Sequence, residues 1–218
     1  MYDSSIGYKK IKTEIGNLMR ELGFTRYKTA TYYRVTAGDM LQFINFQKGE
    51  QWLNGQMTIN IVIQGLFAPD CSFEILQPGG RIGKLLHSDK DNWWHCDTEL
   101  ATAQSIKDIG KVVAEKIIPF FDLMATADGL IMSFNDPASS FLWAIPSSFV
   151  QRGYACLKAR QYKMGVAVFE ENRPGQVAKF KTLKRLTETA LFDEIDHILA
   201  DNTQYNKEKL KITPSSTP

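Results

Sequence analysis

The sequence predicts an α+β fold: an antiparallel meander sheet backed by two long helices and followed by a C-terminal helical extension. The first observation is the segment 24–64, where three runs rich in Thr, Tyr, Phe, Ile and Val are separated by short polar turns containing glycine. Short connections of this kind join neighbouring antiparallel strands. The second observation is that apolar residues recur at helical spacing on both sides of this segment.

The residues before this segment predict an amphipathic helix that packs on the sheet. Four apolar side chains recur at helical spacing and share one stripe: Ile11, Ile15, Leu18 and Leu22. Asp3, Ser4 and Ser5 offer N-cap oxygens at the start of the helix. Gly23 marks its end, because glycine accepts the left-handed backbone that commonly stops a helix.

The third run predicts a sheet with two different faces, because side chains alternate along a strand. One set is apolar and should face the helices: Met57, Ile59, Ile61 and Ile63. The other set is mostly polar: Thr58, Asn60, Val62 and Gln64. We assign the polar side chains of the two earlier runs to the same polar sheet face: Arg26, Lys28, Tyr32, Arg34, Asn45 and Gln47.

This polar sheet face is the candidate binding surface. Side chains such as Arg and Tyr combine hydrogen bonding with flat contact area, which suits recognition of a partner. The candidate partner-binding or ligand-binding residues are Arg26, Tyr32, Arg34, Asn45, Asn60, Gln64, Arg81 and Trp94. The plainer alternative is that the face is only the solvated side of an antiparallel sheet, which is a common arrangement.

Two neighbouring tryptophans stand out in the turn-rich connection that follows the meander. Trp93 and Trp94 adjoin on a predicted strand, so one indole should enter the core while the other remains exposed. An exposed indole suits a contact anchor. We assign this contact role to Trp94.

The same connection holds the densest group of potential metal ligands: His87, Asp89, Asp91, His95, Cys96 and Asp97. Their spacings match neither a structural zinc site nor an EF-hand loop. Cys96 and His95 are adjacent on a strand and point to opposite faces, which works against a thiol–imidazole pair. We therefore expect no metal, no cofactor and no catalytic residue set.

A second long helix is predicted after this connection, capped by Asp97 and Thr98. Its apolar stripe is Ile106, Ile109, Val113, Ile117, Phe120 and Met124. Pro119 lacks a backbone donor and should kink the helix or limit its last turn. Helix, strands and helix together predict one α+β domain over residues 1–125.

The order and spacing of several motifs in this domain resemble one known family. The motifs are Phe24-x-Arg26, Tyr32-Tyr33 followed four residues later by Gly38-Asp39, Asn45-Phe46-Gln47, Phe73, Arg81-Ile82-Gly83 and Asp91-x-Trp93-Trp94. They are similar to a bacterial family catalogued as domain of unknown function 4304, over about residues 5 to 125. The resemblance implies a small cytoplasmic bacterial α+β domain, and it supplies no catalytic residues.

Helices are predicted to dominate from residue 126 to 205, and residues 206–218 are predicted to form a disordered tail. The segment 149–175 places small and large residues close to the positions of one tetratricopeptide-like helical hairpin: Gly153, Ala155, Leu157, Tyr162, Gly165 and Phe169. A repeat solenoid generally needs about three units. We therefore expect this single hairpin to be stabilised by packing against the first domain or against neighbouring helices.

Composition narrows the class of protein. The 218 residues carry a net charge of +2, which is too small for a nucleic-acid signature of the whole chain. Apolar clusters are far shorter than the ~20 residues of a membrane span, and the polar start lacks the apolar core of a signal peptide. The three cysteines are far apart and do not suggest a disulfide framework. We expect a cytoplasmic protein.

The leading functional hypothesis is a non-enzymatic binding module that recognises a protein partner through the polar sheet face. The alternative is a nucleic-acid-binding or nucleic-acid-processing protein that uses the same face. In that alternative Arg26, Lys28, Arg34 and Arg81 would hold phosphates, and Tyr32 or Trp94 would stack on bases.

Overall fold

A computed structural model describes residues 3–50, 53–73, 79–86, 91–143, 147–172, 175, 180 and 188–212. It confirms the α+β class and the antiparallel meander. The strands are β1 (Thr25–Lys28), β2 (Thr31–Val35), β3 (Met40–Lys48), β4 (Gln56–Gly65), β5 (Gly79–Arg81) and β6 (Trp94–His95). They follow the order β1-β2-β3-β4-β5, and β6 pairs with the beginning of β4.

The first predicted run is a hairpin of two strands rather than one strand. In the hairpin, Arg26 of β1 lies opposite Tyr32 of β2, and the register shifts between Arg26 and Lys28. All four residues of β1 are exposed, and β1 forms one end of the strand order. A short, charged and bulged strand at a sheet edge is a common protection against edge-to-edge pairing.

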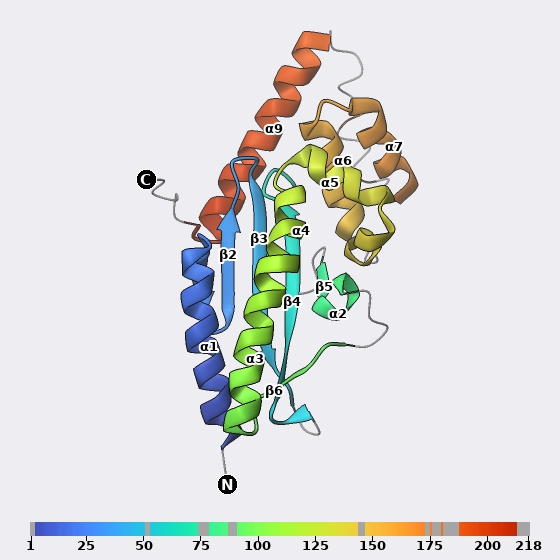
Figure 1. Cartoon of the computed structure of the whole chain (residues 1–218). Helices are drawn as coiled ribbons and strands as arrows, with labels where there is room; N and C mark the ends of the chain where they lie inside the picture. Colours follow the sequence, from blue (N-terminus) through green and yellow to red (C-terminus); the bar gives the residue numbers. More distant parts are fainter. Residues whose placement is uncertain are drawn as a thin grey trace. The chain divides into compact units, whose positions relative to one another are not determined.

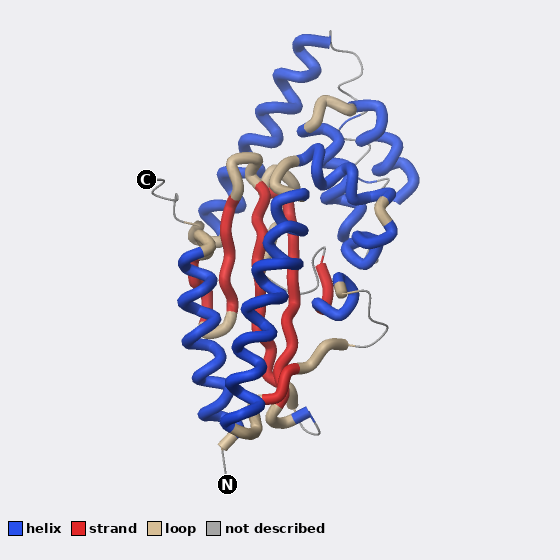
Figure 2. Tube along the Cα trace, viewed as in Figure 1, coloured by secondary structure: helices blue, strands red, loops and turns tan. Residues whose placement is uncertain are grey.

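Two helices cover one face of the sheet, as predicted (Figures 1 and 2). Helix α1 (Ser4–Glu21) begins at Asp3, whose side chain accepts a hydrogen bond from the Ser5 amide at 2.8 Å. Helix α3 (Glu99–Val112) begins at Thr98 and packs against α1. A Cβ on Gly7 would lie 2.1 Å from the Cys96 carbonyl oxygen, so only glycine allows α1 to approach so closely.

A π-helical segment interrupts the second helix directly before Pro119. Regular α-helix ends at Val112 and a π-helical segment, η2, runs from Val113 to Ile117. Helix α4 (Ile118–Leu123) then continues, with Pro119 in its first turn. A proline lacks the N–H that an α-helix requires, and the wider π turn directly before it accommodates this loss.

The chain forms two compact units that are interleaved along the sequence. The first consists of residues 1–34, 42–62 and 79–122, and the second of residues 35–41, 63–78 and 123–218. The predicted division at residue 125 follows chain order. In the structure, residues 35–41 and 63–78 belong to the same unit as the helices after residue 123.

The first unit also contains the short helix α2 (Ile82–Leu85). The second unit contains the described helices that follow α4. They are α5 (Ala127–Met132), η3 (Ser133–Asn135), η4 (Pro137–Trp143), α6 (Ser147–Lys158), α7 (Tyr162–Asn172) and α9 (Glu188–Lys209). Helices α6 and α7 pack against each other around a buried aromatic cluster. In this cluster Phe169 stacks on Phe180 at 5.4 Å between ring centroids, and Tyr154 meets both rings edge-on.

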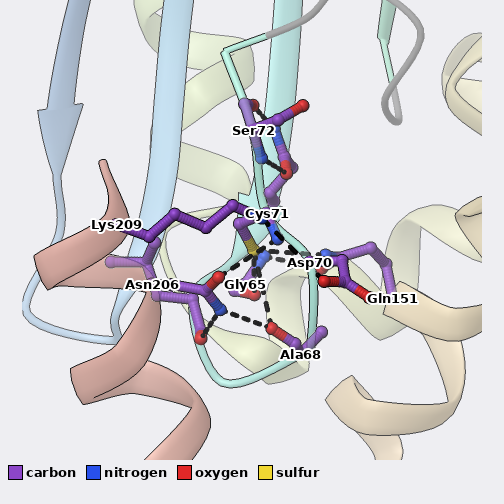
Figure 3. Close-up of polar contacts among 10 residues, drawn as sticks. Gly65, Ala68, Asp70, Cys71, Ser72, Gln151, Asn206 and Lys209 are labelled. Atoms are coloured by element: carbon purple, nitrogen blue, oxygen red, sulfur yellow. Dashed lines mark hydrogen bonds and ion pairs between the residues drawn. The ribbon is translucent and has the colours of Figure 1, made fainter.

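A network of polar contacts fixes the loop after β4 within the second unit (Figure 3). The Asn206 amide group donates to the carbonyl oxygens of Leu66 and Ala68, and its oxygen accepts from the Cys71 amide. Gln151 accepts a hydrogen bond from the Gly65 amide at 2.7 Å. Helix α9 thus continues past the predicted end of the helical extension at residue 205. Residues 213–218 of the predicted tail lie outside the described residues.

Within the described ranges, no single helix is both long and apolar enough to cross a membrane. Residues 99–123 and 127–135, which are bent relative to one another, meet that requirement only as a pair and only by length and composition.

Candidate functional site

The structure divides the predicted binding residues between the two faces of the sheet. Arg26 lies directly opposite Tyr32 in the hairpin, so the two side chains share a face. The Tyr32 hydroxyl lies under α1, because a Cβ on Gly16 would be 2.5 Å from it. These residues are therefore on the side of the helices, and their predicted assignment to the polar face opposite the helices was wrong.

Arg34 lies on the same helix-covered side and is already neutralised. Its guanidinium forms an ion pair with Asp122 of α4 and donates to the Gln42 side chain at 2.7 Å. It also stacks over the Phe24 ring at 5.0 Å. These contacts give Arg34 a structural role, since they join β2 and β3 to α4.

The face opposite the helices carries a chain of hydrogen bonds between side chains. Asn45 donates to the Thr31 hydroxyl at 2.9 Å, and Asn60 donates to the side-chain oxygens of Asn45 and Gln47. Asn60 is only 2% exposed. The predicted apolar and polar sets of β4 are thus correctly separated, but the polar set is buried and bonds mainly to its own neighbours.

The Gln64 side chain forms hydrogen bonds with the loop that follows β4. Its side chain donates to the Ser72 carbonyl oxygen and accepts from the Ser72 amide, and it is fully buried. This two-point contact closes the turn that follows β4.

The two tryptophans have the reverse of the predicted arrangement. Trp94 pairs with Met57 in the sheet and is only 7% exposed, so its predicted role as an exposed contact anchor was wrong. Trp93 is half-buried, and the Arg81 guanidinium lies over its ring at 5.1 Å. Arg81 also pairs with Asp91 at 2.9 Å, so its charge is matched.

Arg26 and Tyr32 line a pocket of about 270 Å³ between α1 and the β1–β2 hairpin, which we call the basic pocket. Its lining residues are Lys12, Thr13, Gly16, Asn17, Arg20, Arg26, Thr29 and Tyr32. Two of the predicted binding residues, Arg26 and Tyr32, therefore meet in one site. Among the described residues, no acidic side chain forms an ion pair with Lys12, Arg20 or Arg26.

The positive charges in the basic pocket act on one another. Partial burial lowers the pKa of the Lys12 ammonium below its ordinary value, and the positive charges of Arg26 and Lys9 lower it further. Burial is the largest cause of this shift, and Arg26 adds to it from within the basic pocket. An anion placed in the pocket would reverse this effect and stabilise the protonated lysine.

The sequence interpretation missed Lys12 and Arg20, although a signal for them exists. Lys12, Gly16 and Arg20 recur every four residues and so share one stripe of α1, next to the apolar stripe. A glycine in the middle of a helix costs about 1 kcal/mol relative to alanine. Gly16 between two cations on one stripe therefore indicates that another group packs closely against the helix backbone there. In the structure this group is the Tyr32 hydroxyl.

Two further features of the sequence are its potential metal ligands and its cysteines. No group of three or more His, Cys, Asp or Glu side chains is arranged to hold a metal ion among those residues, and His87 and Asp89 lie outside them. All three cysteines are buried. Burial raises the pKa of each thiol, to about 12 for Cys71 and to about 11 for Cys156.

The raised thiol pKa values predict slow alkylation of the folded chain. At pH 8, iodoacetamide should label Cys71 and Cys156 much more slowly in the native protein than in urea, because only the exposed thiolate reacts. A thiol whose pKa is raised by folding stabilises the native state fully below the unfolded value of about 8.5, and this stability is lost as pH rises toward the folded value. Mass spectrometry of a labelling time course measures both sites. Equal rates with and without urea would contradict this account.

Comparisons with known proteins identify the family without identifying an activity. No curated protein and no solved structure shows significant similarity to this chain. A family model described as a domain of unknown function, DUF4304, matches residues 15–123. This range contains Gly16, Arg20, Arg26 and Tyr32 of the basic pocket as well as the sheet. The chain belongs to the DUF4304 family.

Proposed function

We propose that this protein is a non-enzymatic binding module that recognises an acidic group of a protein partner in the basic pocket. The observation that carries the proposal is the lack of a paired acid for Lys12, Arg20 and Arg26 among the described residues. Cations held together without a counter-charge repel one another, and a bound anion relieves this repulsion. The proposal moves the predicted contact surface from the polar sheet face to the side of α1 and the hairpin.

A protein partner fits this geometry better than a nucleic acid. Binding to an extended strand needs a basic track with aromatic side chains for stacking. Arg34 and Arg81 are matched by Asp122 and Asp91. Arg81 also belongs to β5, at the opposite end of the strand order from Arg26. Two of the four cations that the nucleic-acid alternative would use, Arg34 and Arg81, are therefore already matched by acids.

The proposal also gives a role to the helices of the second unit. The helices after residue 126 provide a second contact surface, with α6 and α7 acting as a single tetratricopeptide-like pair. The setting is the cytoplasm of a bacterium.

Replacing Arg26 with alanine should weaken binding of an acidic peptide about tenfold, because charge-assisted hydrogen bonds are among the strongest polar contacts. Fluorescence anisotropy with labelled hexaglutamate at about 50 mM salt measures this loss, since higher salt screens the charges. Lys10→Ala is the matched control: Lys10 is exposed on the same helix but does not line the basic pocket.

Three outcomes would contradict the proposal. The first is no binding of hexaglutamate by the wild-type protein at low salt. The second is an equal loss in Lys10→Ala, which would indicate unspecific attraction. The third is tighter binding of a single-stranded oligonucleotide of the same charge, lost in Arg26→Ala, which would favour the nucleic-acid alternative.

A further inference from the structure

We propose that the acidic group taken by the basic pocket is a phosphate monoester on a side chain of the partner protein. This inference rests on the proposed function and specifies its ligand. A phosphorylated side chain carries about −1.5 to −2 charges and three terminal oxygens, whereas a carboxylate carries one charge and two oxygens. Three unmatched cations in one pocket suit the larger charge.

The donors that line the basic pocket are mostly free. Arg26 uses its Nε to donate to the Lys28 carbonyl oxygen, and Arg20 uses one terminal nitrogen to donate to Asn17. No hydrogen bond to another described residue occupies the Lys12 ammonium. Several N–H groups of the three cations can therefore converge on a single oxyanion, as the fork of a guanidinium does on phosphate.

Tyr32 adds a hydrogen-bond donor to the wall of the basic pocket. The residue is only 4% exposed, and its hydroxyl has no hydrogen-bond partner among the described residues. The hydroxyl oxygen is not one of the fully buried unpaired polar atoms, so it is open to the basic pocket that Tyr32 lines. The hydroxyl lies against Gly16, which also lines the basic pocket. It can donate to an oxygen of a bound anion there.

Gly16 keeps this donor available. A Cβ at this position would occupy a point 2.5 Å from the Tyr32 hydroxyl and 3.4 Å from the ring carbon that bears it. The missing side chain therefore leaves room above the hydroxyl in the wall of the basic pocket.

The size of the basic pocket favours a group presented on a side chain. At about 270 Å³ it lies below the ~300–1,000 Å³ of sites that enclose whole small molecules. A phosphate at the end of a side chain needs only its head enclosed, while the rest of the partner remains outside.

Three peptides that differ at one central residue test the inference: a neutral peptide with phosphoserine, the same peptide with Glu, and the same peptide with Ser. Phosphotyrosine is tested in a parallel peptide. By fluorescence anisotropy, one of the phosphopeptides should bind at least about tenfold more tightly than the Glu peptide at equal salt. The isosteric variant Tyr32→Phe should lose several-fold of that preference while the Glu peptide is little affected. Thermal melts of both proteins confirm that the variant folds.

The outcomes separate the two proposals. Equal binding of the Glu peptide and the phosphopeptides overturns the phosphate inference and leaves the binding module intact. No binding of any charged peptide overturns both. Inorganic phosphate competing at the same concentration as the phosphopeptide shows a site for free phosphate, which overturns the assignment to a protein side chain.

Discussion

Replacing Asn206 with alanine is expected to lower the free energy of unfolding of the second unit by about 3–5 kcal/mol. Asn206 is fully buried, and its side chain makes three hydrogen bonds to the backbone of the loop after β4. Alanine would leave the carbonyl oxygens of Leu66 and Ala68 and the Cys71 amide without these partners. Each buried, unsatisfied polar group costs about 1–3 kcal/mol.

Urea unfolding followed by circular dichroism measures this loss, with Gln204→Ala as the matched control. Gln204 is exposed on the same helix and donates to the exposed Glu208 side chain, so its loss should cost less than about 0.5 kcal/mol. Similar unfolding midpoints for Asn206→Ala and the wild type would show that the loop does not depend on this network.

Asn206 also shows why the end of the chain was hard to predict. Its surroundings in sequence, with Asn, Lys and Glu nearby, are polar and resemble those of an unstructured tail. Its burial arises only because the loop at residues 65–71 presents carbonyl oxygens that need donors. The two partners are more than 130 residues apart, and no local pattern reveals such a contact.

Predictions from local sequence patterns were reliable for features that depend on a single helix or strand. The caps at Asp3 and Thr98 lie among the predicted residues, and Ile11 and Ile15 of the predicted α1 stripe are buried, because these features depend on neighbouring residues. The two sides of β4 were also separated correctly, because alternation within one strand suffices.

The predicted site was wrong where several strands had to be related to one another. Whether Tyr32 and Asn60 share a face depends on the turns and the register between strands, and a shift of one residue moves a side chain to the other face. The first run also contains a hairpin that its composition did not reveal. For the same reason the sequence did not reveal which of the two tryptophans is buried. Trp94 was predicted to be the exposed one, but it is only 7% exposed.

Phe169→Ala should lower the free energy of unfolding by about 3–5 kcal/mol, the usual cost of removing a buried phenylalanine ring. Phe169 is fully buried between Tyr154 and Phe180. Its ring occupies the space that a side chain at Gly153 would need, since a Cβ there would lie 2.1 Å from the ring. Urea unfolding measures the loss.

The same contact predicts coupling between positions 153 and 169. In the wild type, Gly153→Ala should cost about 1–3 kcal/mol, because the stacked ring cannot move away without disturbing the cluster. In the Phe169→Ala background the new methyl group enters the cavity, so the substitution should be neutral or stabilising. The resulting interaction energy should be at least about 1 kcal/mol. Gly110→Ala controls for helix propensity: its nearest neighbour would be 3.8 Å away, and it should stabilise by about 0.5–1 kcal/mol. Additive effects of the two substitutions would mean that close packing of α6 on Phe169 does not require glycine at this position.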